Sequence, residues 1–555
     1  MCLSRLIQML PAPIIENIVW FMTNNYRHHH YANTRYSEAH QMLKLRLLGV
    51  CRSWREVILA ELCSLYRIQL FNDGSTSANL LSWPTYIEPP SFTFAHWVKE
   101  VLVEVDYRYI LCGQALQKLS KALAQSSLKF VAARKLHITF VSMNTYTGMP
   151  IQPFVDNVNE FIEYLKQAIP DTTRVVIRFC QEQAPLNGNL TVPLGLLLSQ
   201  LYSLAKDITF KGSGRPLLIP MHSHTGLCRI EYDWDSSSSY YVEMIRHNVQ
   251  ALQMLQIKAT RDHNIASLVY GESGQPMVYH NMRRLILKLR PKPKDIARPM
   301  VEGTPFPSLG QLYITGQYPF GDDTLFRGNC KTLVDLRIPV DVQIMHMLNK
   351  SKVSETGYLE RLRHLEVTEI EALAENEVSS SITISKFAMQ LASSIQSLCI
   401  NSRNYAFNIS NTIYDTSLCH NLRYLSISNS SFSAYTILML VKSLPLLTDL
   451  ETKISYIGNF PGCYHTQKLP KYVAKSMRPI SQNFKCLTLL SGRYISSKSL
   501  ALVGLLISIA CPNFSYMAMP ACYLDDYNYE LRKLVHKPGF TGYAGQIRSL
   551  IFDGW

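Results

Sequence analysis

The histidines and carboxylates between residues 222 and 235 are the side chains of this sequence most suited to direct chemistry. His222 and His224 shortly precede the acidic pair Asp233 and Asp235. Imidazole and carboxylate groups bind metals and transfer protons. No further residue nearby completes a metal or acid-base set, so this stretch predicts a polar loop.

A second histidine group, His28-His29-His30, also suggests a metal site. Three consecutive side chains point in different directions on any regular backbone, and no Cys or carboxylate cluster flanks them. The sequence also lacks GxSxG, GxxxxGK[ST] and HExxH motifs and any Gly-rich nucleotide fingerprint. We therefore expect no metal, no cofactor and no catalytic residue, and a protein that is not an enzyme.

The densest charge feature is a basic segment that only Asp295 opposes. Pro291, Pro293 and Pro299 predict that a strand is followed there by an extended loop. Such a loop binds an acidic or phosphorylated segment, although it would also serve as a solvated loop that keeps the protein soluble. Aromatic residues that stack on bases do not interleave the charges, so nucleic-acid binding is not expected. The basic residues are Arg283, Arg284, Lys288, Arg290, Lys292, Lys294 and Arg298.

The elements that position these residues are indicated by a repeated unit, apolar-x-x-apolar-x-apolar. Copies from Leu252 to Leu422 start 24 to 33 residues apart. They are Leu252/Leu255/Ile257, Met282/Leu285/Leu287, Leu309/Leu312/Ile314, Leu333/Leu336/Ile338, Leu362/Leu365/Val367, Ile395/Leu398/Ile400 and Leu422/Leu425/Ile427. Later copies are Phe484/Leu487/Leu489, Phe514/Met517/Met519 and Ile547/Leu550/Phe552, and weaker ones are Val98/Val101/Val103, Ala133/Leu136/Ile138 and Leu227/Ile230/Tyr232.

This spacing resembles that of long, irregular leucine-rich repeats, in which a helix follows each short strand. Ser433 to Leu444 and Ser497 to Ala510 are such helices. One unit cannot bury its own apolar face, so neighbouring units must stack. We predict the α/β class, with a horseshoe-shaped repeat solenoid over residues 95–555; a set of unrelated α/β domains is the alternative.

The side chains that alternate with the apolar strand positions are predicted to line the concave face of the solenoid, because successive strand residues face opposite sides. This face is the expected substrate-binding surface. Its predicted residues are Arg284, Lys288, Arg290, Tyr313, Arg337, His364, Glu366, Tyr424 and Ser426.

Two motifs precede the repeats. Leu10-Pro11 begins an amphipathic helix, and Val50-Cys51-Arg52-Ser53-Trp54 opens another that we expect over Ser53 to Leu65. In this order they resemble the F-box family, although the polar stretch Thr23 to Gln41 stands where an F-box has a short turn. The resemblance implies a three-helix F-box over residues 1–70 with an insertion at 23–41. The Gly- and Ser-rich stretch that begins at Phe71 predicts a linker over residues 71–94.

An F-box followed by leucine-rich repeats resembles the substrate-recognition subunits of cullin-type (SCF) ubiquitin ligases. The resemblance implies a non-catalytic adaptor that docks on a Skp adaptor, and through it on a cullin, while the repeats capture an acidic or phosphorylated protein substrate. A leucine-rich interaction scaffold with a non-functional F-box, or a helical cap on the first repeat, are the alternatives. By this resemblance the adaptor-binding residues are Leu10, Pro11, Ile14, Ile15, Ile18, Leu47, Leu48, Val50, Cys51 and Trp54.

Composition limits the class further. With 555 residues, 47% hydrophobic and 17% charged, the chain is too long for one compact core and too apolar to be disordered. The net charge of +14 permits an acidic partner. Thirteen cysteines without a CxxC pair suit a reducing compartment, so we expect the cytosol or nucleus. Pro11, Pro13 and Glu16 interrupt the first apolar run, so we do not expect a signal peptide. The later apolar runs are shorter than the about 20 residues of a membrane span, so we expect no membrane-spanning segment.

Overall fold

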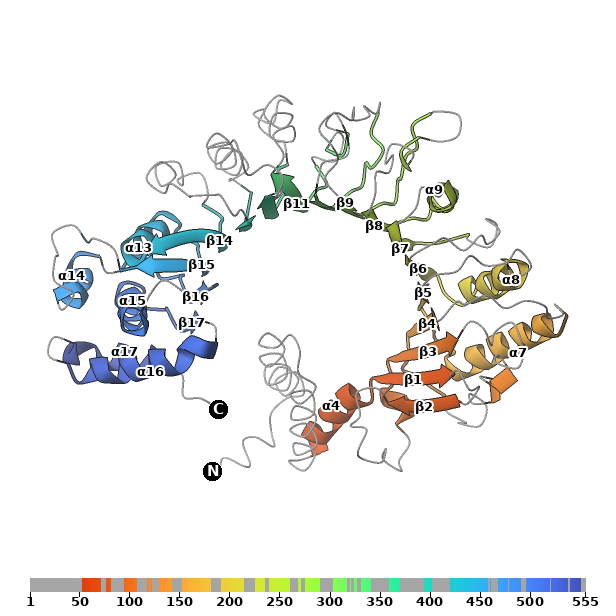
Figure 1. The fold of residues 1–555 in the computed structure, drawn as a ribbon, viewed down its shortest axis with the longest axis horizontal. Coiled ribbons are helices and arrows are strands. Elements are labelled where there is room, and N and C mark those ends of the chain that lie inside the picture. Colours follow the sequence, from red (N-terminus) through yellow and green to blue (C-terminus); the bar gives the residue numbers. More distant parts are fainter. Residues whose placement is uncertain are drawn as a thin grey trace. The chain divides into compact units, whose positions relative to one another are not determined.

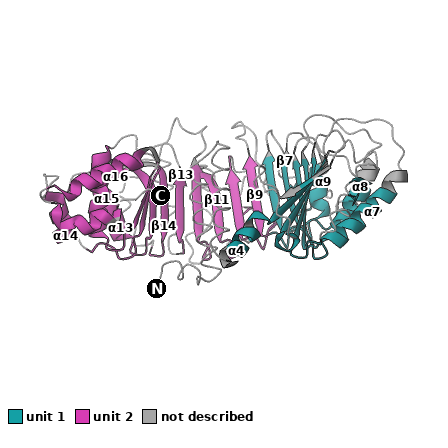
Figure 2. Ribbon diagram, turned by 90° about the horizontal axis from the view of Figure 1, so that it is seen from below, with its two compact units in different colours: residues 1–282 teal, residues 283–555 magenta. Residues whose placement is uncertain are grey.

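The computed structural model divides the chain into two compact units, residues 1–282 (unit 1) and 283–555 (unit 2), as Figure 2 shows. The structure describes residues 52–70, 76–80, 94–106, 117–118, 120–121, 129–141, 152–180, 191–213, 225–234, 239–259, 268–270, 275–289, 303–316, 320, 324–326, 331–340, 359–369, 394–401, 420–457, 460, 468–477, 479–490, 496–519, 521–537 and 540–550.

Unit 1 is built on a sheet whose strands lie in the spatial order β2, β1, β3, β4, β5, β6, β7, β8. Among these described strands β2 pairs antiparallel with β1, and the remaining strand pairs are parallel. The helices α7, α8 and α9 follow β4, β5 and β7 and lie beside the strands (Figure 1). The strands are β1 (Leu65–Leu70), β2 (Thr76–Leu80), β3 (Glu100–Asp106), β4 (Lys135–Val141), β5 (Arg174–Cys180), β6 (Asp207–Ser213), β7 (Arg229–Trp234) and β8 (Met254–Ala259). The helices are α4 (Arg52–Leu62), η1 (Ala95–Trp97), α7 (Gln152–Ala168), α8 (Thr191–Tyr202) and α9 (Ser239–His247).

Unit 2 has the same architecture, with strands that pair in parallel from β9 to β17 in chain order. They are β9 (Arg284–Leu289), β10 (Gln311–Thr315), β11 (Asp335–Val340), β12 (His364–Glu369), β13 (Ser397–Asn401), β14 (Tyr424–Ser433), β15 (Asp449–Tyr456), β16 (Cys486–Leu489) and β17 (Tyr516–Ala518). The helices are α13 (Ala434–Ser443), α14 (Leu469–Ser476), α15 (Ser497–Ala510), α16 (Ala521–Val535), η8 (Thr541–Tyr543) and α17 (Ala544–Leu550).

The repeated apolar positions form the core. Strand registers align Leu285, Leu312, Leu336, Leu365 and Leu398 in one row, and none of these side chains is more than 6% exposed. The second apolar residue of each strand is buried in the same way, from Leu287 to Ile427. The predicted α/β class with a leucine-rich-repeat-like solenoid is therefore confirmed.

Local sequence explains where the helices α13 and α15 begin. The Ser433 hydroxyl accepts the backbone N–H of Thr436 at the start of α13, at 3.1 Å. Ser496 caps α15 in the same way through the N–H of Ser499, at 3.2 Å. Both satisfy an amide that has no partner within its helix. Leu500 to Ala510 are all buried, because α13, α14, α16 and α17 all pack against α15.

Polar side chains in the turns before the strands tie successive repeats together. The Asn483 amide donates to the carbonyl of Pro445 at 2.8 Å, and the Asn513 amide donates to Gln482 at 2.7 Å. In unit 1, Asn281 donates to Gln250 at 2.6 Å. Each bond satisfies a carbonyl of the preceding repeat, so the turns are held in register as well as the strands.

The boundary of the predicted helical domain differs from the structure. The expected third helix, Ser53 to Leu65, is α4, but it ends at Leu62 and the chain then enters β1. Tyr66 and Ile68 of β1 are buried, and β1 pairs in parallel with β3. Within the predicted linker at 71–94, Thr76–Leu80 form β2. The sheet therefore begins about 30 residues before the predicted solenoid start at residue 95. The sequence analysis missed β1 and β2 because both strands are half polar and their apolar residues alternate only weakly.

The last predicted repeat, Ile547/Leu550/Phe552, is wrong as a strand. Ile547 and Leu550 are buried, but they lie on the helix α17. A spacing of three between apolar residues suits a helical turn as well as the first part of the repeat unit. The pattern alone therefore did not distinguish the two.

Within the described ranges, no helix combines the length and apolar character needed to cross a membrane.

Candidate partner-binding surface

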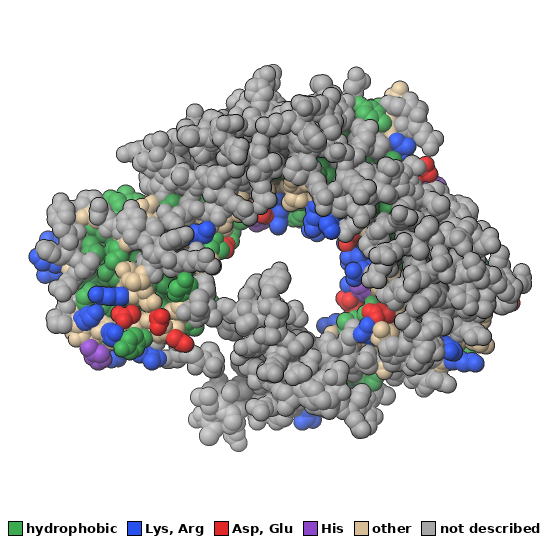
Figure 3. Space-filling model, in the orientation of Figure 1, with side chains coloured by type: hydrophobic (Ala, Val, Ile, Leu, Met, Phe, Trp, Pro, Cys, Tyr) green, Lys and Arg blue, Asp and Glu red, His purple; other side chains and the backbone are tan. Residues whose placement is uncertain are grey.

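Side chains that alternate with the core residues lie on the opposite face of each sheet, which we call the open face. In unit 2 the middle position of each strand supplies Ile286, Tyr313, Arg337, Glu366, Cys399, Ser426 and Glu451 in register. The first residue of each strand lies on the same face because side chains alternate. Figure 3 shows Lys and Arg side chains beside Asp and Glu side chains on the described surface.

An aromatic ring between two guanidinium groups is the centre of the open face of unit 2. The Cζ atoms of Arg284 and Arg337 lie 5.0 Å and 4.4 Å from the ring centroid of Tyr313. Both distances permit cation–π attraction. The Tyr313 hydroxyl donates to the Asp335 carboxylate. Burial, and then this hydrogen bond, raise the pKa of Tyr313.

Arg337 extends this cluster to the next strand. Its Nη1 lies 3.1 Å from Glu366 Oε2, and its Nε lies 3.8 Å from Asp335 Oδ1. One guanidinium therefore contacts an aromatic ring and two carboxylates on β10, β11 and β12. The charges hold one another in place, which fixes the shape of this surface before any partner binds.

The acidic part of the open face lies on β12 and β15. The Tyr424 hydroxyl donates to Glu451, and burial followed by this hydrogen bond raises the pKa of Tyr424. Cys399 lies in register between Glu366 and Ser426. Burial raises the pKa of the Cys399 thiol to about 11, and the nearby Glu366 and Glu451 carboxylates add to the effect.

Because of this raised pKa, Cys399 should react slowly with iodoacetamide. The thiolate is the reactive form, and at pH 8 a thiol of pKa 11 is about 0.1% ionised, whereas one near 8.5 is about 25% ionised. We expect modification of Cys399 in the folded protein to be at least about 100-fold slower than in the urea-unfolded protein, as measured by mass spectrometry at pH 8. Equal rates in the two states would contradict the buried, acidic environment of this thiol.

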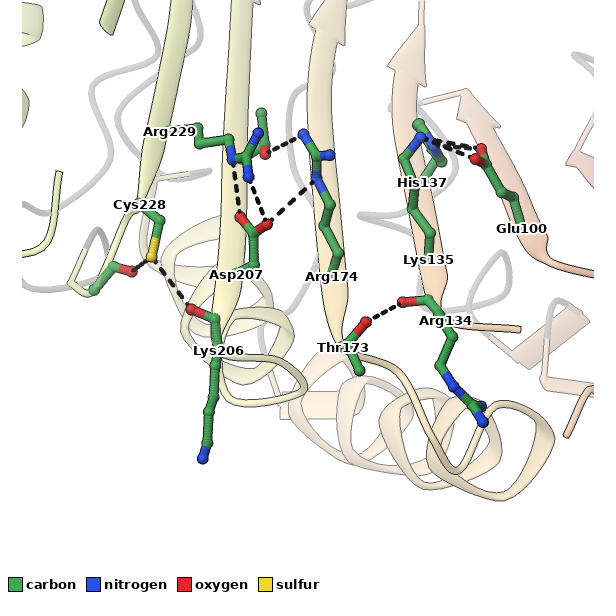
Figure 4. A network of polar contacts seen from close by, with 12 residues as sticks. Glu100, Arg134, Lys135, His137, Thr173, Arg174, Lys206, Asp207, Cys228 and Arg229 are labelled. Atoms are coloured by element: carbon green, nitrogen blue, oxygen red, sulfur yellow. Dashed lines mark hydrogen bonds and ion pairs between the residues drawn. The ribbon is translucent and has the colours of Figure 1, made fainter. Parts of the chain in front are cut away.

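Unit 1 carries a second charged network on its own open face (Figure 4). Lys135 Nζ lies 3.1 Å from both Glu100 oxygens, and His137 Nε2 lies 3.1 Å from Glu100 Oε2. Burial and the Lys135 charge lower the pKa of His137, although Glu100 opposes the shift. The imidazole is therefore neutral at pH 7 and serves as a hydrogen-bond partner of Glu100.

A carboxylate shared by two arginines joins the next three strands of unit 1 (Figure 4). Arg229 donates to both oxygens of Asp207, through Nε at 3.2 Å and Nη2 at 3.0 Å. Arg174 Nε lies 3.8 Å from the same carboxylate, and its Nη2 donates to Thr209 at 3.3 Å. The two-pronged Arg229 contact fixes the guanidinium plane. Each unit thus presents pre-oriented charges on the open face of its own sheet, a surface suited to recognising a polar partner.

The predicted concave-face residues are partly brought together. Arg284, Tyr313, Arg337 and Glu366 form the cluster described above, while Lys288 and His364 are exposed on the same face. Among the described residues, no hydrogen bond or ion pair involves the Lys288 or His364 side chain. Tyr424 is half-buried beside Glu451, and Arg290 lies outside the described residues.

Ser426 corrects one expectation, that every residue alternating with the core is exposed. Its side chain is buried. A small residue between the larger Tyr424 and Glu451 groups is covered by its neighbours, so position on a face does not alone give exposure. The unit 1 residues Glu100, His137, Asp207 and Arg229 were missed by sequence reasoning. The same alternation, applied to the weaker repeats from Val98 onward, could have found them.

The predicted adaptor-binding residues lie almost entirely outside the described residues. This holds for Leu10, Pro11, Ile14, Ile15, Ile18, Leu47, Leu48, Val50 and Cys51. Trp54 lies within α4, where the structure gives the backbone course. Their role in docking therefore stays a prediction.

The other candidate chemistry is also largely outside the described chain. His28-His29-His30, His222, His224 and Asp235 all lie beyond it, and Asp233 lies in β7. Among the described residues, no three His, Cys, Asp or Glu side chains are grouped to hold a metal ion.

No family model matches the sequence, and no curated protein matches it significantly. The crystal structure of a TLR13–ssRNA13 complex is 12% identical with a TM-score of 0.36, over 77% of this chain and 50% of that one, so this chain spans about half of its length. The crystal structure of a protein from Bacteroides fragilis is 12% identical with a TM-score of 0.20, over 69% of this chain and 81% of that one.

The class of protein therefore follows from the strands themselves. Registered parallel strands with a repeated apolar core define a leucine-rich-repeat-like α/β solenoid. Solenoids of this kind present an extended surface suited to protein interaction.

Proposed function

We propose that this protein is a non-catalytic substrate-recognition adaptor of an SCF-type ubiquitin ligase. Its open faces bind the substrate protein, and its N-terminal segment docks on a Skp adaptor and through it on a cullin. The observation that carries the binding role is the unit 2 cluster of Arg284, Tyr313 and Arg337, fixed across neighbouring strands beside the exposed Lys288 and His364. Pre-oriented groups lose less conformational freedom on binding.

The ligase role rests on the order of Leu10-Pro11 and Val50-Cys51-Arg52-Ser53-Trp54. Such an adaptor acts by positioning its substrate. Holding the substrate near a ubiquitin-charged conjugating enzyme raises the effective concentration of the substrate's lysines. The alternative is a leucine-rich-repeat scaffold whose N-terminal segment does not dock. We place the protein in the cytosol or nucleus, which suits the free thiols of Cys63, Cys228, Cys399, Cys486 and Cys511.

The experiment that tests this proposal is affinity purification of the full chain from its native cells, with identification of the recovered proteins. We expect a Skp-type adaptor and a substrate protein to be recovered together. The double variant Lys288→Ala/His364→Ala removes two exposed groups of the open face and should reduce substrate recovery at least about fivefold. Adaptor recovery should not change, because both groups lie far along the sequence from the docking motifs.

A matched control removes Lys471 and Lys475, which are exposed on α14. The variant Lys471→Ala/Lys475→Ala should recover both the substrate and the adaptor at wild-type levels. Equal substrate recovery by all three proteins would remove the open face of unit 2 from the proposal. Recovery of a substrate without any Skp-type adaptor would favour the scaffold.

A further inference from the structure

The residue immediately before each strand of unit 2 forms a row along the amino-terminal edge of the sheet, which we call the edge row. In parallel strands held in register, these residues lie next to one another from strand to strand. Four of the nine are basic and none is acidic. In chain order they are Arg283, Gly310, Val334, Arg363, Gln396, Arg423, Thr448, Lys485 and Ser515.

The four basic side chains of the edge row are available to a partner. Arg283, Arg363, Arg423 and Lys485 are all exposed. Within the part of unit 2 that the structure describes, none of them forms a side-chain hydrogen bond or ion pair. This distinguishes them from the open-face cations such as Arg337, which Asp335 and Glu366 already hold.

The backbone beneath these side chains is fixed. The Arg363 carbonyl accepts the N–H groups of Gln396 and Ser397 at 2.8 Å and 2.9 Å. The carbonyls of Arg283, Arg423 and Lys485 each accept two N–H groups of the next repeat in the same way. The edge row is therefore a rigid line of anchoring points, and only its side chains remain to contact a ligand.

The spacing of the basic residues sets the length of that ligand. Strands lie about 4.8 Å apart, so Arg283 on β9 and Arg363 on β12 are about 14 Å apart along the edge. Each further step, to Arg423 on β14 and to Lys485 on β16, is about 10 Å. The line is thus about 34 Å long, which an extended peptide of about ten residues spans at about 3.4 Å per residue. A carboxylate at every third or fourth residue matches these steps.

The neighbouring open-face positions favour a polypeptide over a nucleic acid. Asp335 and Asp449 begin strands directly beside the edge row, and Glu366 and Glu451 lie two residues further along, at the third position of β12 and β15. A nucleic-acid strand carries a phosphate on every nucleotide and is wider than one row, so it brings more negative charge past these carboxylates, and is repelled more, than a peptide with one carboxylate at every third or fourth residue. An extended peptide is narrow enough to follow the edge row alone. Arginine in particular binds carboxylates through two parallel hydrogen bonds.

We propose that the edge row of unit 2 binds an extended acidic segment of a partner protein, about ten residues long, through Arg283, Arg363, Arg423 and Lys485. This inference rests on the proposed function only in that the ligand is a protein. It names the substrate class by its chemistry, and it assigns capture to the edge of the sheet in addition to the open face.

The test is fluorescence anisotropy of the full-length protein with a fluorescein-labelled twelve-residue Gly/Ser peptide that carries Asp at every third position. We expect this peptide to bind with a micromolar Kd that weakens as salt is raised. The same peptide with Asn in place of Asp should bind at least about tenfold more weakly. The double variant Arg363→Gln/Arg423→Gln should lose about tenfold in affinity for the Asp peptide and retain its circular dichroism spectrum.

The matched control is Lys471→Gln/Lys475→Gln, which changes the net charge equally on α14. Its affinity for the Asp peptide should stay within about twofold of wild type. An equal loss in both variants would overturn the proposal in favour of a general charge effect. Equal binding of the Asp and Asn peptides would also overturn it, and this comparison uses the wild-type protein alone. Tighter, Arg363-dependent binding of a twelve-nucleotide oligothymidine would assign the row to nucleic acid instead.

Skp-adaptor binding is measured on the same preparations, so that the two proposals fail separately. Loss of peptide binding with adaptor docking intact counts against the edge row only. Loss of adaptor docking with peptide binding intact counts against the ligase role only.

Discussion

Replacing the buried Leu336 with Ala is expected to lower the free energy of local unfolding around β11 by about 3 kcal/mol. The Leu336 side chain is 0% exposed and lies in register between Leu312 of β10 and Leu365 of β12. Its truncation leaves a cavity that faces both neighbouring repeats. Because each repeat of a solenoid is stabilised only by its neighbours, the loss is felt at two interfaces. Hydrogen exchange of the β10, β11 and β12 amides measures this change directly.

The control for this substitution is Val334→Ala, two residues earlier, whose side chain is 36% exposed. We expect it to change the same free energy by less than about 0.5 kcal/mol. If Leu336→Ala cost no more than Val334→Ala, the position of Leu336 in the core row would be incorrect.

The second large effect concerns docking on a Skp adaptor. The double variant Leu10→Ala/Pro11→Ala should weaken adaptor binding at least about thirtyfold, since loss of a central apolar anchor commonly costs about 2 kcal/mol or more. These residues are a cleaner choice than Trp54, because Trp54 could also pack within its own domain. Surface plasmon resonance of the full chain on immobilised adaptor gives the two dissociation constants. Circular dichroism shows whether the helices still form.

An exposed apolar residue of unit 2 provides the control. Leu446 is 38% exposed, and Leu446→Ala should leave adaptor binding unchanged. If the intact, folded protein fails to bind the adaptor at micromolar concentration, the insertion between Thr23 and Gln41 has disabled the F-box-like segment. The interaction scaffold would then replace the ligase adaptor as the function.

The repeat architecture was predictable because it depends on the spacing of apolar residues within each strand and the turn before it. A buried strand needs apolar residues two apart, and the preceding turn needs one three residues earlier, as in Leu362, Leu365 and Val367. The helix Ser497–Ala510 was likewise predicted to the residue, since its cap and apolar run are both local signals. These features depend on the period of the backbone, which is the same wherever the strand finally lies.

Strands with a polar residue at a core position were missed. The β15 repeat reads Leu447, Leu450 and Thr452, and Thr452 is fully buried. The β5 repeat begins with Thr172, whose hydroxyl donates to the Ile169 carbonyl at 2.9 Å. A threonine fills such a position with its methyl group, but an apolar pattern does not detect it. Neighbouring strands supply the registers that reveal both repeats.

Which side chains meet on the open face was decided by the tertiary structure. Arg284, Tyr313 and Arg337 come from three successive repeats, and contact arises because β9, β10 and β11 pair in parallel. The sequence alone determined which strand residues alternate with the core positions and so lie on the face that could contact a partner. It did not determine that Arg337 is held by Glu366 while Arg363 of the edge row stays exposed. Pairing of charges depends on distances of a few ångströms across strands, and those distances are set by register and side-chain direction.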